Sequence, residues 1–263
     1  MPADPSLLGV ALGLAIGFIL GLLGGGGSIL AVPILLLVFG LPAKVAIATS
    51  LVVVGIGAAV GFLTHLRQGT VDLRVALSFG VCAIGGAFVG ARLARWVPSA
   101  VQLALFAAFA FTAAGLMLRD SMKTGGHPAA APADDVTSAG ARRTGVSWLF
   151  ALQAVAVGVL TALIGAGGGF LIVPTLTLLA GVPVRQAVGS SLLVIAMNAA
   201  SGLLGYLGQV PIDWRFALWL GASVAVGAVA GTRVVRHLPQ RRIKQGFAVM
   251  ILLVGTYLIV SRL

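Results

Sequence analysis

The chain is poor in charged residues and almost lacks cysteine. Only 9% of its 263 residues are charged and 59% are hydrophobic, whereas a soluble domain carries about 25% charged residues. The mean hydropathy is +1.12. These values exclude a water-soluble domain and predict an all-α integral membrane protein. The single cysteine, Cys82, excludes an intramolecular disulfide and a thiolate metal cluster, and its Ala/Gly/Val-rich surroundings favour a packing role.

Acidic residues are missing from every apolar run, which excludes the usual membrane-embedded proton-relay carboxylate. Neither glycine-rich stretch is followed by Gly-Lys-Ser/Thr, so a nucleotide phosphate loop is excluded. No catalytic triad or metal-ligand cluster is present, and we expect no enzyme activity, metal or cofactor.

The net charge of +11 is spread between apolar runs. That distribution is typical of membrane loops next to anionic lipid rather than of nucleic-acid binding, and it weakly favours an anionic solute.

Two glycine-dense stretches, Gly24 to Pro33 and Gly165 to Pro174, are related by an offset of 141 residues. The offset holds without a gap as far as Pro98 and Pro239, and it pairs loop residues such as Asp72 with Asp213. Shared apolar composition does not produce so many identities, so we infer a tandem duplication. The expected organisation is a first transmembrane repeat over 6–119, a flexible linker over 120–146 and a second repeat over 147–263. Since Met1 to Ser6 contains no Lys or Arg, we expect the first apolar run to be retained rather than cleaved as a signal peptide.

The apolar runs predict helices in the same order in both halves. They are Leu7 to Leu23, Ile29 to Phe39, Val45 to Leu63, Val75 to Leu93 and Val101 to Leu118, then Trp148 to Ile164, Phe170 to Ala180, Gln186 to Leu207, Phe216 to Val235 and Phe247 to Val260. The pieces after the glycine runs are too short to cross a bilayer core, which takes about 20 helical residues. If each broken element crosses once, the repeats are parallel; if both pieces cross, the repeats are inverted. We favour the parallel arrangement, with about eight spans built from about ten helical segments, although the Lys/Arg distribution does not decide between the two.

The glycine runs are expected to line a polar cavity. Each interior glycine costs a helix roughly 1 kcal/mol relative to alanine, and non-helical backbone survives at membrane depth only where it is buried in protein or faces water. A break frees N–H groups and aims the positive end of the next helix, at Ser28 or Phe170, into the gap, which favours an anion. Close helix packing through small residues is the alternative. Pro33 and Pro174 are expected in the first turns of the following helices.

Polar residues in the long spans are the remaining candidates. The pairs Thr49-Ser50 and Ser190-Ser191 either face the glycine runs and coordinate an anion or bond the carbonyls of their own helices. Asn198, the sole mid-span amide, is expected to line the cavity. The predicted substrate-binding residues are Gly24, Gly25, Gly26, Gly27, Ser28, Thr49, Ser50, Gly165, Ala166, Gly167, Gly168, Gly169, Ser190, Ser191 and Asn198. By contrast, His65 is expected to be a solvated interfacial residue rather than a proton relay.

The duplicated glycine-to-proline pattern and the two hydroxyl pairs resemble the sulfite exporter TauE/SafE family, also called the toluene-sulfonate uptake permeases, over nearly the whole chain apart from the linker. The resemblance implies a multi-pass secondary transporter of the bacterial inner membrane for sulfite, sulfoacetate or other sulfonates. Ala166 replaces a glycine and Gly169 stands opposite Ser28, so the second site departs from the first. We expect alternating access by rocking of the halves, and the alternatives are a passive anion channel or a membrane scaffold. The direction, a coupling proton or sodium ion, and a homodimer are left open.

Overall fold

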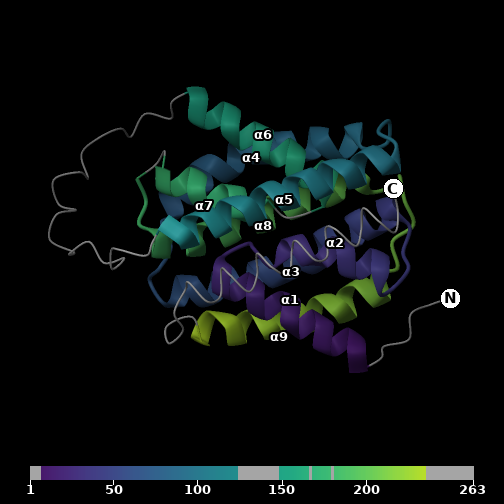
Figure 1. The fold of residues 1–263 in the computed structure, drawn as a ribbon, viewed down its shortest axis with the longest axis horizontal. Helices are drawn as coiled ribbons and strands as arrows, with labels where there is room; N and C mark the ends of the chain where they lie inside the picture. Colours follow the sequence, from purple (N-terminus) through teal and green to yellow (C-terminus); the bar gives the residue numbers. More distant parts are fainter. Residues whose placement is uncertain (1–6, 124–147, 166–167, 179–180, 235–263) are drawn as a thin grey trace, which may run out of the picture.

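The computed structural model describes residues 7–123, 148–165, 168–178 and 181–234, and this part of the chain is all-helical (Figure 1). Its helices are α1 (Leu7–Leu23), α2 (Ser28–Leu37), α3 (Ala43–Arg67), α4 (Leu73–Leu93), α5 (Ser99–Lys123), α6 (Trp148–Ile164), α7 (Gly169–Leu178), α8 (Val184–Tyr206) and α9 (Trp214–Val234). Most of the expected linker, residues 166–167 and the expected helix from Phe247 to Val260 lie outside the described residues. Among the helices of these described ranges, α3, α4, α8 and α9 are long and apolar enough to cross a membrane.

Both glycine runs interrupt a helix. The first ends α1 at Leu23, and α2 then begins at Ser28. In the second half α6 ends at Ile164 and α7 begins at Gly169, the residue 141 positions after Ser28. Two details differ from the sequence expectation. Pro33 is the sixth residue of α2 and Pro174 the sixth of α7, rather than first-turn residues. The helix α5 continues to Lys123, because Met and Lys are good helix formers.

The two pieces of the broken element form a hairpin. A Cβ on Gly27, just before α2, would lie 2.9 Å from the Cα of Leu20 in α1. At the other end of the hairpin, a Cβ on Gly9 would lie 3.3 Å from the ring of Phe39, just after α2. Since α2 returns along α1, the chain leaves this element on the side where it entered.

The helices α3 and α8 run in opposite directions. A Cβ on Gly55 would lie 3.1 Å from the Cβ of Ala199, and one on Gly61 would lie 3.2 Å from Leu192. As the position in α3 rises, the position in α8 falls, so the two equivalent helices are antiparallel. This antiparallel relation differs from the expected parallel arrangement. The inverted alternative had both pieces of the broken element crossing, whereas α2 has only 10 residues, too few to span a bilayer core. In the described part of the chain, α3 and α4 follow the hairpin in the first half, and α8 and α9 occupy the same places in the second half.

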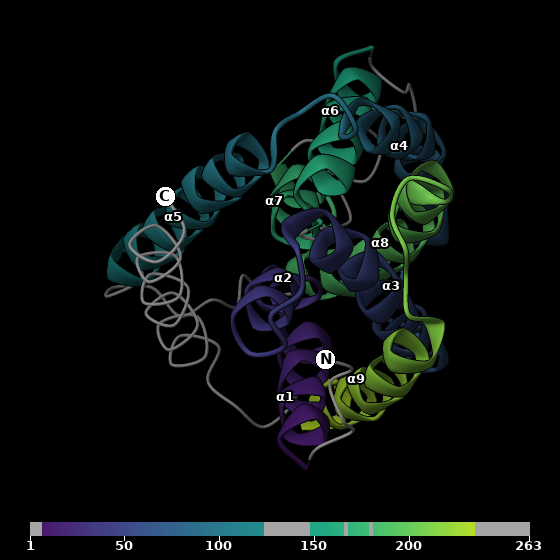
Figure 2. The same cartoon turned by 90° about the vertical axis from the view of Figure 1, so that its right-hand side faces the viewer.

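Figure 2 shows α3 and α8 at the centre, with α1 and α9 on one side and α4 and α6 on the other. Small residues let each outer pair approach closely. A Cβ on Gly17 of α1 would lie 2.7 Å from the carbonyl carbon of Val224 in α9. Its equivalent Gly158 in α6 would meet the carbonyl carbon of Ala83 in α4 at 3.0 Å, and Val224 is 141 positions after Ala83. The same contact thus recurs in both halves, with each half supplying one helix to each pair.

Candidate functional site

The two glycine breaks touch each other at the centre of the bundle. Gly25 has a φ of +140°, and a Cβ there would lie 2.7 Å from the carbonyl carbon of Gly169. A side chain at either position would push the two halves apart, so only glycine permits the contact. The structure therefore brings the first predicted glycine run and the start of α7 together in one place.

Each break is closed by a serine from the other half. The Ser50 hydroxyl of α3 donates to the Gly165 carbonyl at 2.8 Å and also to the carbonyl of Ile47 in its own helix at 2.7 Å. At the equivalent positions, the Ser191 hydroxyl of α8 donates to the Gly24 carbonyl. Ser50 and Ser191 thus face the glycine runs, and each also donates to a carbonyl of its own helix. Coordination of an anion by these hydroxyls stays a prediction. Because each hydroxyl has one proton and gives it to carbonyls, these serines fix the breaks rather than supply free donors.

Free donors come from the backbone of the first break. Within the described part of the chain, the N–H groups of Gly25, Gly26 and Gly27 donate to no carbonyl or side chain, and all three residues are buried. The Ser28 hydroxyl donates to the Gly25 carbonyl at 2.6 Å, which tightens this turn before α2. Buried N–H groups without a partner are rare in native structures. Unpaired N–H groups just before the start of a helix are donors of the kind that bind an anion.

Asn198 is the second unusual group. It lies in the middle of α8 with 0% of its surface exposed, and neither its Oδ1 nor its Nδ2 has a hydrogen-bond partner among the described residues. An unpaired buried amide costs a protein several kcal/mol in an apolar medium, on the order of 2–7. Asn198 is one turn beyond Ile195, whose Cδ1 would lie 2.9 Å from a Cβ on Gly25. This placement agrees with a polar site next to the breaks.

Thr161 is a buried polar residue that the sequence analysis missed. It is 2% exposed, its Oγ1 has no partner among the described residues, and a Cβ on Gly168 would collide with that oxygen. The 141-residue offset could have found it, because its counterpart is Leu20. The exchange of an aliphatic for a hydroxyl side chain, four residues before a glycine break, is the difference between the halves that marks this position.

Other candidates have different neighbours. Ser190 accepts from the Asp72 N–H at 2.9 Å and donates to the Asp72 carbonyl at 3.3 Å, so it holds the α3–α4 loop and does not bond a break. Thr49 is buried beside Ser50. Ala166 and Gly167 lie outside the described residues. The expectation for His65 was wrong: it is 3% exposed, and its Nδ1 lies 2.8 Å from the Thr70 hydroxyl, because the chain after α3 turns back over the ring.

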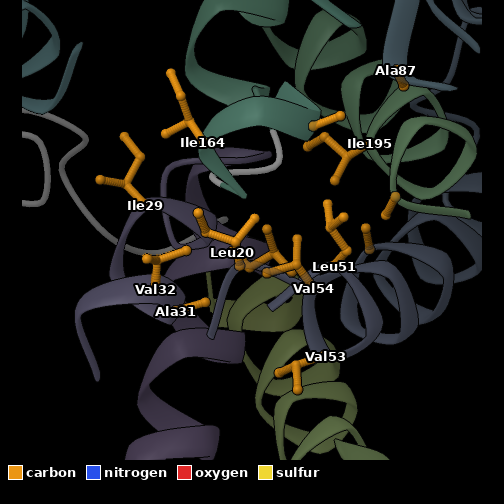
Figure 3. Close-up of a cluster of buried hydrophobic side chains, with 14 of the residues drawn as sticks. Leu20, Ile29, Ala31, Val32, Leu51, Val53, Val54, Ala87, Ile164 and Ile195 are labelled. Carbon is orange, nitrogen blue, oxygen red and sulfur yellow. The ribbon is translucent and has the colours of Figure 1, made fainter. Parts of the chain in front are cut away.

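Apolar side chains surround the breaks (Figure 3). Leu20, Leu51, Ile164 and Ile195 come from four different helices and are at most 1% exposed. They exclude water from the backbone that the breaks leave without helix bonds. In such surroundings the electrostatic attraction between an N–H group and an anion is stronger than in water.

Comparison with known proteins gives a family match along the chain. The sequence profile described as "Sulfite exporter TauE/SafE" matches residues 9–258. The chain belongs to this family. The TauE/SafE chain is 32% identical over 249 residues to a "Probable membrane transporter protein" of Xylella fastidiosa, covering 93% of this chain and 91% of the relative.

Two further relatives have similar names. The "Probable membrane transporter protein YdhB" of Bacillus subtilis is 27% identical, over 86% of this chain and 88% of its own. The "Probable membrane transporter protein MJ0441" of Methanocaldococcus jannaschii is 30% identical, over 76% and 73%. No solved structure gives a significant match. With its apolar helices, the TauE/SafE chain is a multi-pass membrane protein of a transporter family.

Proposed function

We propose that this TauE/SafE chain is a secondary transporter of the cell inner membrane for small sulfur-containing anions such as sulfite or sulfonates. The observation that carries the proposal is the central meeting of two broken helices, where buried N–H groups of Gly25, Gly26 and Gly27 lack partners among the described residues. A small oxyanion would accept from these groups, and Asn198 would add an amide donor. The family match supports this choice of solute.

The inverted arrangement supports alternating access. In inverted-repeat transporters the site lies near the bilayer midplane, and one half moves against the other around it. Here Ser50 and Ser191 are each the eighth residue of a long helix, about 10 Å from its start at 1.5 Å per residue. Because α3 and α8 start on opposite sides, both breaks extend towards mid-depth. A passive anion channel or a scaffold would use the glycines only for packing.

The test is sulfite and methanesulfonate flux into liposomes that contain the purified protein. We expect saturable flux that shows counterflow, and we expect Asn198→Leu to reduce its maximal rate at least tenfold. Thermal stability should be unchanged or higher in this variant, because the substitution removes an unpaired buried amide. Flux without saturation or counterflow would indicate a channel, and no flux of any tested anion would indicate a scaffold.

Coupling and assembly are measured with the same preparation. Imposed proton and sodium gradients, applied separately, identify the ion whose gradient drives anion accumulation. The mass of the protein in detergent, corrected for bound detergent, distinguishes a monomer from a homodimer.

A further inference from the structure

A hollow lies away from the glycine breaks, where α3 and α9 end side by side. Its volume is about 340 Å³, and it is lined by apolar side chains together with Thr64, Arg67, Gln68 and Arg233. Small-molecule pockets in proteins have volumes of about 300–1,000 Å³, so a small oxyanion fits with room to spare. The helices that form it come from different halves of the chain.

The two arginines are not neutralised. Neither the guanidinium of Arg67 nor that of Arg233, nor the amide of Gln68, makes a hydrogen bond or ion pair with any group in the described segments. Basic residues are common in the last turn of a helix because they complement its dipole. At the end of α3, however, the His65 carbonyl already accepts from the N–H groups of Gln68 at 3.1 Å and Thr70 at 3.2 Å. Backbone donors thus cap this terminus, and the arginine charges remain available.

At the end formed by α4 and α8, the residues equivalent to those of the hollow contact other groups of the protein instead. Arg92, the counterpart of Arg233, places its guanidinium 5.4 Å from the centre of the Phe88 ring. Gln209, the counterpart of Gln68, donates to the Ala91 carbonyl at 3.3 Å. Gly208 replaces Arg67. The inverted fold therefore presents the same two helix ends twice, and only the α3–α9 end offers two arginines and an amide to a ligand.

We propose that this hollow, which we call the arginine pocket, binds an oxyanion group through Arg67, Arg233 and the Gln68 amide. Guanidinium groups bind sulfonate, sulfite and phosphate oxygens by two parallel hydrogen bonds. The oxyanion belongs either to the dissolved solute that approaches the central site or to an anionic lipid head group. The first source rests on the proposed transport function, and the second does not.

The experiment compares the double variant Arg67→Gln/Arg233→Gln with Arg92→Gln, which removes a guanidinium of the same type at the α4–α8 end. For a dissolved solute, sulfite flux into liposomes of phosphatidylcholine alone should show a KM raised about five- to tenfold in the double variant, the scale of two solvent-screened ion contacts. The maximal rate should stay within about twofold of the wild type, and Arg67→Lys/Arg233→Lys should restore part of the affinity. Equilibrium binding of radiolabelled sulfite provides the same comparison if the protein carries no flux, so failure of the transport proposal is seen separately.

For a lipid head group, the wild type and Arg92→Gln should retain phosphatidylglycerol in native mass spectra, and the double variant should lose it. Either result supports the arginine pocket and identifies the source of the oxyanion. The proposal is overturned if the double variant elutes as a monodisperse protein and matches Arg92→Gln in KM, sulfite binding and phosphatidylglycerol retention.

Discussion

Replacing Gly24 by alanine should destabilise the protein more than the same change at Gly40. The two glycines have nearly the same left-handed backbone, with φ of +63° and +64°, so alanine costs each roughly 1–2 kcal/mol of backbone strain. Their surroundings differ. A Cβ on Gly24 would lie 2.6 Å from the Cγ1 of Val188 and 2.8 Å from its Cα, whereas nothing lies within 4 Å of a Cβ on Gly40. Overpacking of this kind costs about 1–3 kcal/mol, and that is the expected difference between the variants.

Thermal unfolding in detergent, at one fixed scan rate, measures this difference. At about 2–4 °C per kcal/mol for a chain of this size, Gly24→Ala should unfold roughly 2–12 °C below Gly40→Ala. The gain in stability from a less flexible unfolded chain is the same in both variants and cancels. Equal unfolding temperatures would refute the reasoning, because they would mean that the contact between the first break and α8 does not require glycine.

Two further predictions concern the relation between the halves. Ser50→Ala and Ser191→Ala should each lower stability by about 1–3 kcal/mol, since each leaves a buried carbonyl of a break without its donor; thermal unfolding checks this, and a silent change at either position contradicts the equivalence of the two closures. In a Cys82→Ala background, cysteines at Gly55 and Ala199 should form a disulfide within one chain, because the two Cβ positions are 3.1 Å apart, close to disulfide geometry. Mobility on a non-reducing gel shows the bond, and its absence under oxidation contradicts the antiparallel packing of α3 and α8.

Much of the helix content could be predicted from the sequence because hydropathy reports burial in lipid directly. The bounds of α1 and α6 match the apolar runs Leu7–Leu23 and Trp148–Ile164, and the interruption at Gly24 to Gly27 follows from glycine's low helix propensity. The direction of α2 could not be predicted. Hydropathy does not distinguish a short helix that continues across the membrane from one that returns, and the Lys/Arg residues are too evenly divided to decide.

Only part of the candidate site could be predicted, because the sequence of one span does not show which helix packs against it. The offset of 141 residues places Ser50 and Ser191 at equivalent positions, but only the fold shows that each bonds the break of the opposite half. Ser190 has the same local sequence context as Ser191, yet it bonds the backbone of Asp72. Adjacent residues on a helix face different directions, and the choice between them depends on which helix lies alongside. That information is tertiary and is not contained in a single span.

The exchange of closing contacts has a consequence for the proposed transport cycle. Because α3 holds the break after α6 and α8 holds the break after α1, a displacement of one half strains both breaks together. The α4–α8 end is packed, with a Cβ on Gly205 lying 3.1 Å from the Phe88 carbonyl, while the α3–α9 end contains the arginine pocket. Inverted halves can exchange such arrangements, so a second state would open the α4–α8 end and pack the α3–α9 end. In that state Arg67 and Arg233 would approach each other, and the cost of bringing the two cations together would be lowest while an oxyanion lies between them.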